Sequence, residues 1–409
     1  MNKVFQYLDS EKDEIIEFTK ELIRIPTVNP PGDNYEEIVA LLEDKCRRLG
    51  FDTKRHITPR AKLKSLGIEG GSKRVSLVVD WDTGSKKTLH MNGHYDVVPP
   101  TSNWTFDPFK PVLRDGRIYG RGSEDMKGDI AAMIFSLKAL KECNVNPPVN
   151  IQMSWTPDEE IGGESGLGYL VERGLVKGDY ALGEGYSRNF VSHGNKGVLW
   201  LEVTIIGKSS HASRPDKGIN AFEKMLKVAE ELEKLKLRIE KRVTRYDIKS
   251  HREKSPTLVM GGVMKGGNKI NIVPDIATFS IDRRIIPEES VKSARDEILK
   301  ALNIIKKEDK EIKIIIKEFA SCEPVVVDKE KKLCKAALRS IKKVSGKSAK
   351  LAIMPGVTDL RFFIERGVES IGYSAYGGEC WHGDDEFVYV DSLIETAKVY
   401  AQIIMCLGG

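Results

Sequence analysis

Short apolar segments alternate with helical segments along the first half of this chain, and this alternation restricts the fold more than any other feature. A series in which strands and helices take turns is typical of an α/β domain with a mostly parallel sheet. The sequence therefore predicts an α/β fold with a largely parallel, mixed sheet. The expected strands are 75–80, 88–98, 149–155 and 179–185, and the expected helices are 11–24, 35–49 and 126–143.

The pattern changes after residue 196, where the elements follow in the order strand, helix, strand, strand, helix, strand. This order predicts a small α+β sandwich of the ferredoxin-like kind. The α/β alternation then returns. We therefore expect residues 197–319 to form a domain inserted between the two parts of a first domain, 1–196 and 320–409. The later elements are expected at 198–208, 220–237, 257–285 (two strands), 288–303, 311–319, 328–345, 349–354, 358–366, 368–373 and 391–406.

Glycine pairs in "GGVMKGGNKINIVP" (261–274) are compatible with a phosphate-binding loop or with the turns of a hairpin. A phosphate loop needs a strand before it and a helix after it, because N–H groups at the helix start face the anion. Here a second strand follows the glycines. The sequence therefore favours hairpin turns.

The composition is that of an ordinary soluble globular protein of 409 residues. Its 65 basic and 60 acidic residues leave a formal charge of +5, a small excess. The basic stretch 54–64 could be a nucleic-acid or membrane patch, but no aromatic residue interleaves its cations, so a solvated loop is favoured. The six cysteines are dispersed, which predicts reduced thiols rather than disulfides. The N-terminus is unlike a signal peptide, and no apolar run approaches the roughly 20 residues needed to span a bilayer. We therefore expect a cytoplasmic protein with neither a membrane nor a nucleic-acid partner.

The expected strand 149–155 runs into "TPDEEIGG" (156–163), where three carboxylates are adjacent. Apolar and polar residues alternate in the strand, which indicates one buried face. Buried like charges raise one another's pKa strongly unless cations neutralise them. One or two divalent ions would supply that neutralisation, so the acidic cluster indicates a metal site.

Further metal-binding side chains occur at strand ends or in glycine-rich loops. His94 is in the pattern His-x-Asp, so Asp96 lies on the same side of the strand and can orient a ligating imidazole. Asp125 follows a glycine-rich turn, Glu184 ends a strand, and His382 lies in a late glycine-rich loop. The alternatives are a core or capping role for His94 and a helix N-cap for Asp125. Open α/β sheets place ligands at the carboxyl ends of strands, which favours a metal site.

The order of these residues along the chain also matches the order of the motifs in a known family. The chain resembles the M20 family of co-catalytic metallohydrolases, which includes acetylornithine deacetylase, succinyl-diaminopimelate desuccinylase, aminoacylase-1 and glutamate carboxypeptidase. The resemblance spans residues 93 to 386. The matching segments are "GHYDVVP", "GRGSEDMKG", "TPDEEIGG", "GEG", "GKSSHASRPDKGINA", "NIVP", "DRRIIP" and "ECWHGDDE".

The resemblance implies a zinc-peptidase-like catalytic domain, an inserted dimerisation or lid domain, and two Zn²⁺ ions per subunit, for which Co²⁺ or Mn²⁺ could substitute. Asp125 would bridge the ions. His94 and Glu184 would complete one ion's site, and Glu160 and His382 the other's. Carboxylate and imidazole ligands suit zinc, and two ions about 3.5–4 Å apart can hold both a nucleophile and a carbonyl oxygen.

The resemblance further implies catalytic roles for three residues. Glu159 would be the general base, because its position matches the family's base and a nearby carboxylate can take a proton from an acidified water. Asp96 would orient His94. His211, in "SSHASRP", would reach from the inserted domain into the active site of a partner subunit. Without the resemblance, His211 would be interpreted as a surface turn residue.

Substrate contacts are expected at four positions, and the chain departs from the family pattern at two places. A small residue is commoner where Glu124 precedes Asp125, so Glu124 could add negative charge beside the ions. Val357 stands where desuccinylases usually have a hydroxyl residue, which weakens a succinyl assignment. The expected substrate contacts are Asn271, Arg284, Gly356 and Arg361, of which the arginines suit a carboxylate because their planar fork binds it bidentately.

The function expected from the resemblance is removal of an N-acyl group, acetyl or succinyl, from an amino acid or diamino acid, as in the deacylases of amino-acid biosynthesis. The substrate would be a small N-acyl amino acid or a dipeptide-like molecule, and the protein a homodimer through the inserted domain. A metallo-carboxypeptidase or an aminoacylase of the same family is the alternative. A non-catalytic binding protein on this fold would show gaps among the ligands or at the base, and the sequence has none.

Overall fold

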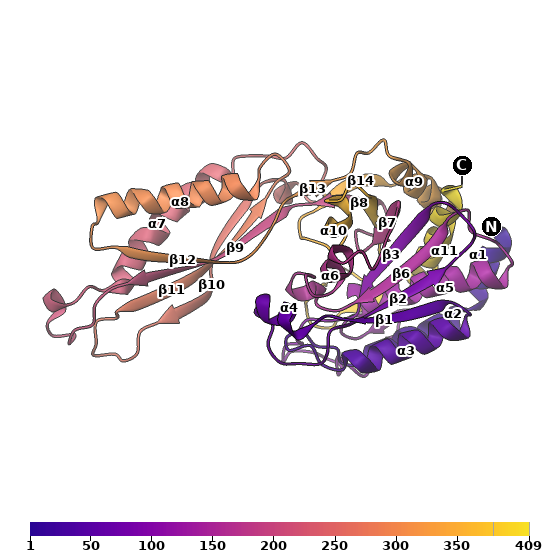
Figure 1. Cartoon of the computed structure of the whole chain (residues 1–409), viewed down its shortest axis with the longest axis horizontal. Coiled ribbons are helices and arrows are strands. Elements are labelled where there is room, and N and C mark those ends of the chain that lie inside the picture. The colour runs from indigo at the N-terminus through magenta and orange to yellow at the C-terminus, as the bar shows by residue number, and fades with distance from the viewer. Residues whose placement is uncertain (379, 409) are drawn as a thin grey trace. The chain divides into compact units, whose positions relative to one another are not determined.

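The computed structural model describes residues 1–378 and 380–408, which form two compact units (Figure 1). The first unit comprises Met1–Gly194, Val327–Ala352 and the chain from Thr358 on, and the second comprises Asn195–Val326 and Ile353–Val357. The second unit thus extends beyond the expected range 197–319 at both ends. Each unit has an apolar core of its own. Glu379, within the motif "ECWHGDDE", lies outside the described residues.

The first unit is built on a mixed sheet. Its strands are β1 (Asp52–Ile57), β2 (Val75–Trp81), β3 (Thr88–His94), β6 (Asn150–Thr156), β7 (Tyr180–Gly183), β8 (Phe190–Asn195), β14 (Lys350–Met354) and β15 (Glu369–Gly372). The order is β1-β2-β6-β3-β7-β15-β8, and β14 also pairs with β8. The central strands β6, β3, β7 and β15 are parallel, and the flanking pairs are antiparallel. This arrangement confirms the predicted α/β fold with a mostly parallel sheet.

Helices cover both faces of this sheet because consecutive strand residues point to opposite sides. Leu77 and Val79 belong to one apolar cluster, and Val78 between them belongs to another. The first cluster includes α1 (Asn2–Ser10), α2 (Lys12–Arg24), α3 (Tyr35–Arg48), α5 (Gly128–Glu142), α9 (Lys332–Ser345) and α11 (Val390–Cys406). The second includes α6 (Leu167–Glu172) and α10 (Arg361–Ile364).

A small three-stranded sheet, which the sequence did not predict, ties a late segment of the chain to an early one. It consists of β4 (Val112–Arg114), β5 (Arg117–Tyr119) and β16 (Phe387–Tyr389), in the order β16-β5-β4. Because β16 pairs with β5, the loop that carries His382 is brought to the segment that precedes Asp125. The basic stretch 54–64, expected to be a solvated loop, instead contributes to β1 and to α4 (Arg60–Ser65), a helix with no buried residue.

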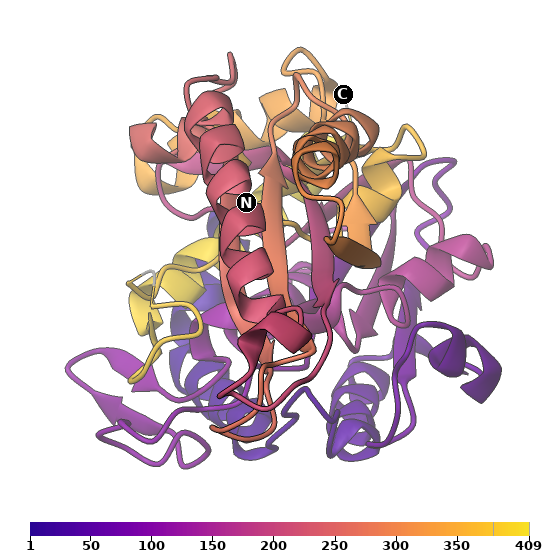
Figure 2. The same ribbon diagram turned by 90° about the vertical axis from the view of Figure 1, so that its left-hand side faces the viewer.

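The second unit is an antiparallel sheet with two helices on one face, α7 (Ala221–Ile239) and α8 (Val291–Glu308). Figure 2 shows these helices side by side in front of the strands. The strands are β9 (Gly197–Ile206), β10 (Thr257–Gly266), β11 (Ile276–Ile285) and β12 (Lys313–Cys322), in the order β10-β11-β9-β12. This is the ferredoxin-like arrangement that the sequence predicted. A strand rather than a helix follows the glycine pairs, so they belong to a hairpin between β10 and β11, as expected.

Neither a disulfide nor a membrane-spanning helix is part of the described structure. Within the described residues, the six cysteines form no disulfide. Within residues 1–378 and 380–408, no helix combines the length and the apolar character needed to cross a bilayer.

The parallel strands of the first unit bring one set of strand ends together. In the register of β3 and β6, His94 lies opposite Thr156, so the two strands end at the same level. Met91 of β3 lies opposite Leu182 of β7, so β7 ends at this edge too. The carboxyl ends of three neighbouring strands therefore meet, and the side chains that follow them form the candidate site.

Candidate metal centre

Imidazole and carboxylate side chains converge at this edge of the sheet. His94 ends β3, and Glu184 follows β7. The turn after β6 carries Asp158, Glu159 and Glu160 and is called the acidic turn below. Their potential ligand atoms form two groups, in each of which all atoms lie within 4.8 Å of one another. One group is His94, Glu159 and Glu184, and the other is His94, Asp125 and Glu160. The shared histidine makes the two groups adjacent, which is the arrangement that a pair of ions needs.

The His94 imidazole is buried and held in one orientation. Its Nδ1 atom lies 3.0 Å from the backbone oxygen of Asp96 and 3.6 Å from the Asp96 carboxylate. Its Nε2 atom lies 3.0 Å from Asp125 Oδ1. Because a carbonyl oxygen only accepts, Nδ1 carries the proton and Nε2 is the atom directed at the site. Burial lowers the pKa of His94, but hydrogen bonds to Asp125 and Asp96 outweigh it and hold that pKa well above its usual value.

The Asp96 carboxylate mainly positions the acidic turn. It accepts hydrogen bonds from the backbone N–H groups of Glu159 (3.2 Å) and Glu160 (3.3 Å). It also accepts one from the side-chain amide of Asn29 at 2.9 Å. The sequence had placed the orienting role in the Asp96 side chain. The structure adds that the backbone oxygen of the same residue makes the closer contact with His94.

Asp158 is set apart from the two glutamates that follow it. Its backbone has a left-handed φ of 66°, and its buried carboxylate turns away to meet Arg74, whose Nε lies 2.9 Å from Oδ2. Asn29 and Tyr35 donate to its other oxygen, each at 3.0 Å. One of the three adjacent acids is therefore neutralised by a buried arginine, and only Glu159 and Glu160 remain for a metal site.

Glu159, Glu160 and Glu184 are in an environment that disfavours their charges. Burial and then the neighbouring Glu184 raise the pKa of Glu159 well above its usual value. Burial and Asp125 do the same to the pKa of Glu184, and they raise the pKa of Glu160 as well. Cations between these carboxylates would offset the repulsion, since they favour the ionised forms. The buried set of carboxylate and imidazole donors thus fits divalent ions such as zinc.

His382 reaches the same place from the late loop. Its Nε2 atom lies 3.0 Å from Glu160 Oε2 and 3.5 Å from Asp125 Oδ2. Hydrogen bonds to Asp125 and Glu160 raise the pKa of His382 to about 10. The Asp125 carboxylate thus contacts two histidines, and the helix after it has no side-chain cap, so the N-cap interpretation of Asp125 was wrong.

Glu124 makes contacts that the sequence did not suggest. Its carboxylate accepts hydrogen bonds from backbone N–H groups of the late loop, at Gly377 (2.7 Å) and Gly378 (3.1 Å), and whether it adds charge beside the ions stays a prediction. Cys380 donates a third hydrogen bond to this carboxylate from its backbone N–H, at 3.3 Å.

The remaining predicted residues lie elsewhere. His211, Asn271, Arg284 and Gly356 are in the second unit, and Arg361 in the first. His211 Nδ1 accepts from the backbone N–H of Ser213 at 3.2 Å, so a neutral ring carries its proton on Nε2. Arg284 makes a bidentate pair with Asp282, at 2.8 and 2.9 Å. Arg361 donates to the Gly162 carbonyl and to Glu164, so its guanidinium is already engaged.

Several supporting residues escaped the sequence analysis. Glu386 accepts from the backbone N–H groups of Glu124 and Asp125, and it forms a buried ion pair with Arg121 at 2.7 Å. Asp359 is buried, and neither of its carboxylate oxygens has a hydrogen-bond partner among the described residues. Burial raises the pKa of Asp359 to about 7. Glu386 lies inside the last matched motif, so the motif was the available signal.

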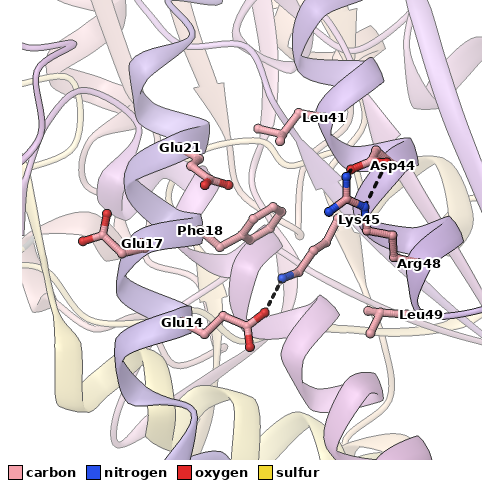
Figure 3. A pocket seen from close by; sticks show the side chains of 9 residues that line it. All are labelled: Glu14, Glu17, Phe18, Glu21, Leu41, Asp44, Lys45, Arg48 and Leu49. Carbon is pink, nitrogen blue, oxygen red and sulfur yellow. Dashed lines mark hydrogen bonds and ion pairs between the residues drawn. The ribbon is translucent and has the colours of Figure 1, made fainter.

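A second concave region, of about 340 Å³, lies between α2 and α3 (Figure 3). Glu14, Glu17, Glu21 and Asp44 line it, but cations lie between them, and no histidine contributes. Lys45 pairs with Glu14 at 2.6 Å, and Arg48 pairs with Asp44 at 2.9 Å. Lysine and arginine thus pair with Glu14 and Asp44 in this region, whereas histidines pair with Asp125 and Glu160 at the strand ends.

Comparison with known proteins agrees with this site. The model of "Peptidase family M20/M25/M40" matches residues 90–405. An uncharacterized metallohydrolase, MJ0457 of Methanocaldococcus jannaschii, is 29% identical over 416 residues, which cover 96% of this chain and 99% of the relative. Aminoacylase-1 of Sus scrofa is 28% identical over 404 residues, covering 95% and 94%. The crystal structure of the M20 family metallo-carboxypeptidase Sso-CP2 from Sulfolobus solfataricus has a TM-score of 0.80 at 21% identity, over 97% of this chain and 99% of that one.

Proposed function

Because the chain belongs to peptidase family M20/M25/M40 and is therefore a metal-dependent hydrolase, we propose that it removes an acyl group from the nitrogen of an amino acid or diamino acid. Acetyl and succinyl are the proposed acyl groups. The observation that carries the proposal is the convergence of the proposed metal ligands and the proposed base in the first unit. These side chains are His94, Asp125, Glu159, Glu160, Glu184 and His382.

We assign the ligands as the family pattern implies, with Asp125 shared between the ions. His94 and Glu184 would hold one ion, and Glu160 and His382 the other. Zinc is the proposed metal. When bound, the ions would polarise the amide carbonyl and make a water molecule more acidic. The contact of His382 with both Asp125 and Glu160 supports the second of these ligand sets.

Glu159 is the proposed general base. It would accept a proton from the attacking water and pass it to the leaving nitrogen, a transfer that a carboxylate of raised pKa performs well near neutral pH. The Asp96 carboxylate holds the Glu159 backbone through its N–H group, which supports a fixed position for the base. Glu159 and Glu160 are consecutive, so one can ligate while the other faces the water.

Residues of the second unit are proposed to bind the substrate. His211 would donate its Nε2 proton to the carbonyl oxygen in the active site of a partner subunit, and the hydrogen bond at its Nδ1 supports the required tautomer. Asn271 and Arg284 would bind the substrate carboxylate. The backbone N–H of Ala212 donates to the Asn271 carbonyl at 3.0 Å, so the histidine and the asparagine lie on neighbouring segments. We propose a homodimer through the second unit, so that His211 can reach the active site of the partner subunit.

Hydrolysis of a dipeptide is the second candidate. It is favoured by the likeness to a solved metallo-carboxypeptidase, whereas the similarity to aminoacylase-1 favours the acyl amino acid. Both reactions break an amide bond beside a free carboxylate, so the same ligands and base would serve. The two substrates differ in the group on the carbonyl side of the amide, which is an acetyl or succinyl group in one case and an amino-acid residue in the other.

The test is a comparison of turnover among substrates. Zinc-loaded protein should hydrolyse N-acetylornithine or N-succinyl-diaminopimelate with a kcat/KM at least about tenfold above that for an N-blocked dipeptide, a difference of about 1.4 kcal/mol in transition-state binding. Protein stripped with a chelator should be inactive until zinc is returned. Preference for the dipeptide would establish the carboxypeptidase alternative. No hydrolysis of any N-acyl amino acid would refute the proposal.

A further inference from the structure

The Glu124 carboxylate is buried and surrounded by backbone of the loop that leads to His382. Its Oε1 atom accepts from the N–H groups of Gly377 (2.7 Å) and Gly378 (3.1 Å), and its Oε2 atom accepts from that of Cys380 (3.3 Å). The fit is close, because a Cβ on Gly377 would lie 2.6 Å from the Glu124 carboxyl carbon. An anion that gathers several N–H groups of one loop fixes the path of that loop.

His382 depends on such anchors because it lies outside regular secondary structure. Its backbone has a left-handed φ of 61°, and 55% of its side chain is exposed. After His382, Glu386 binds the backbone N–H groups of Glu124 and Asp125. Before His382, Glu124 binds the backbone N–H groups of Gly377, Gly378 and Cys380. Hydrogen bonds therefore connect the segment around Asp125 to the late loop both before and after His382.

We propose that Glu124 is a positioning residue: by holding Gly377, Gly378 and Cys380, it fixes the His382 imidazole against Asp125 and Glu160 and strengthens the binding of the ion that these three side chains would share. The inference rests on the proposed metal site. It concerns a residue at which this chain departs from the commoner family pattern. Groups that orient a metal ligand typically contribute about 10–100-fold to affinity.

The chemistry of the contact explains why a carboxylate is needed. All three partners are donors, and a carboxylate offers only acceptors. A glutamine keeps one acceptor oxygen for Gly377 and Gly378, but its NH₂ group would face the N–H of Cys380. Glu124→Gln should therefore loosen one end of the loop without opening a cavity, whereas Glu124→Ala would leave all three donors unpaired and could fail to fold.

The first experiment measures the loop in metal-free protein, by hydrogen exchange and mass spectrometry. The amide of Cys380 should exchange at least about tenfold faster in Glu124→Gln than in wild type, because it loses its acceptor, and the amides of Gly377 and Gly378 should exchange faster by a smaller factor, because their acceptor becomes neutral. The matched control is Glu369→Gln. Glu369 accepts from the backbone N–H of Leu333 at 3.2 Å, and it lies at the amino end of β15, the edge opposite the candidate site.

The second experiment is an isothermal calorimetric titration with zinc, which measures metal binding independently of catalytic activity. Wild type and Glu369→Gln should bind two ions alike. In Glu124→Gln one ion should bind as in wild type, and the dissociation constant of the other should rise by about 10–100-fold. A melting scan without metal would first establish that the variant is folded.

Each outcome decides between the proposals. Unchanged exchange, or faster exchange with both zinc affinities unchanged, would overturn the positioning role of Glu124. Equal weakening of both ions would also overturn it, because the effect would not be confined to the ion beside His382. Wild type that binds no zinc at all would instead remove the proposed function itself.

Discussion

Consecutive acidic residues in this chain have different surroundings, and the surroundings determine what each residue can do. Asp158 is held by Arg74, Tyr35 and Asn29, whereas Glu159 and Glu160 face other ionisable groups. Ser165 also donates to Asp158, and a carboxylate paired with a cation and three neutral donors stays a structural element. Carboxylates that meet only like charges and histidines remain available to a metal ion or a proton.

Measuring turnover and zinc content together distinguishes whether Glu159 is a general base or a metal ligand. Glu159→Ala should lower kcat by about 10²–10⁴-fold, because proton transfer to and from a positioned carboxylate is lost. The zinc content should stay near two ions per chain, since the proposed ligand sets do not include Glu159. Activity would be measured with the best substrate, and metal by elemental analysis of the same sample. Loss of an ion together with activity would make Glu159 a ligand.

Removing Arg74 should be costly because its partner would remain buried. Both side chains are almost fully inaccessible, so Arg74→Met would leave the Asp158 charge uncompensated. We expect the free energy of unfolding to fall by about 3–5 kcal/mol, as for other broken buried pairs. Urea unfolding would measure the change.

Two further variants test the cause of that loss. Adding Asp158→Asn to Arg74→Met should restore part of the stability, because the unpaired charge is then gone. Arg48→Met breaks an exposed pair with Asp44 and should change stability by less than about 1 kcal/mol. If Arg74→Met were no worse than Arg48→Met, the buried pair would not be what supports the acidic turn.

At the scale of elements, the turn after β6 depends on glycine. Gly163 has a φ of +70°, and a Cβ there would lie 1.9 Å from Asp359 Oδ1. Gly174, which follows α6, has a similar φ of +62°, but a Cβ there would meet nothing within 4 Å. Alanine at either position carries the strain of a left-handed backbone, about 1–2 kcal/mol. Only at Gly163 does a clash add to it.

We therefore expect Gly163→Ala to lower the melting temperature by several degrees more than Gly174→Ala. The clash should also move the turn that carries Glu159 and Glu160, so zinc affinity should fall in Gly163→Ala alone. Scanning calorimetry and a zinc titration on both variants would measure the two effects. Similar melting temperatures and affinities in the pair would mean that the turn absorbs the methyl group.

The elements that place the proposed ligands were predictable from periodicity, whereas the supports of those ligands were not. The strand predicted at 88–98 is β3, and that at 149–155 is β6, each displaced by no more than a few residues at its ends. β4, β5 and β16 have three residues each, too few to show an alternation. The hydrogen bonds of Glu124 join residues more than 250 positions apart through backbone groups, which leave no pattern in the sequence.

The site itself was predicted as a set of residues but not as a geometry. Motif order gave His94, Asp125, Glu160, Glu184 and His382, and the structure brings their side chains together. The separation of Asp158 from its neighbours could not be foreseen, because it depends on Arg74, which precedes β2 and is distant in sequence. For the same reason, the engagement of Arg361 by Gly162 and Glu164 was not expected.

At the scale of the whole molecule, buried acids should make the stability of the metal-free protein depend on pH. Burial raises the pKa of Asp129 from 3.8 to about 8. The folded state thus holds this proton more tightly than the unfolded state does. Its contribution to stability is complete below about pH 4 and is lost as the pH rises through about 8. Unfolding should therefore become easier between pH 5 and 7.

Asp129→Asn should remove this dependence. Asparagine can still accept from the backbone N–H of Ala375, which lies 2.7 Å from Asp129 Oδ1. The slope of unfolding free energy against pH, between pH 5 and 7, should fall by up to about 1.4 kcal/mol per pH unit. Urea unfolding in chelator would measure it. Asp107→Asn is the control, because Lys110 and a backbone N–H lower the pKa of exposed Asp107 and it titrates below this range. Parallel curves for wild type and Asp129→Asn would show that Asp129 ionises freely when folded.

The proposed action of His211 in a partner subunit makes a prediction about mixtures of two inactive variants. Glu159→Ala lacks the base and His211→Ala lacks the proposed carbonyl donor, so each homodimer should be nearly inactive. In a mixed dimer, the subunit with an intact Glu159 receives the intact His211 of its partner, and one of the two sites is complete. Random exchange makes half of the dimers mixed, so mixing equal amounts should restore about a quarter of wild-type turnover.

The opposite geometry gives a different result. If His211 served its own subunit, every site in the mixture would lack either the base or the donor, and mixing would restore nothing. The double variant mixed with wild type gives a second test: an equal mixture should keep about a quarter of wild-type turnover if His211 serves the partner, because mixed dimers then have no complete site, and about half if His211 serves its own subunit. Gel filtration with light scattering would establish that the exchanging species is a dimer. A fully active monomer would remove the need for a partner's histidine altogether, and the second unit would then have to deliver His211 to the strand ends of its own chain.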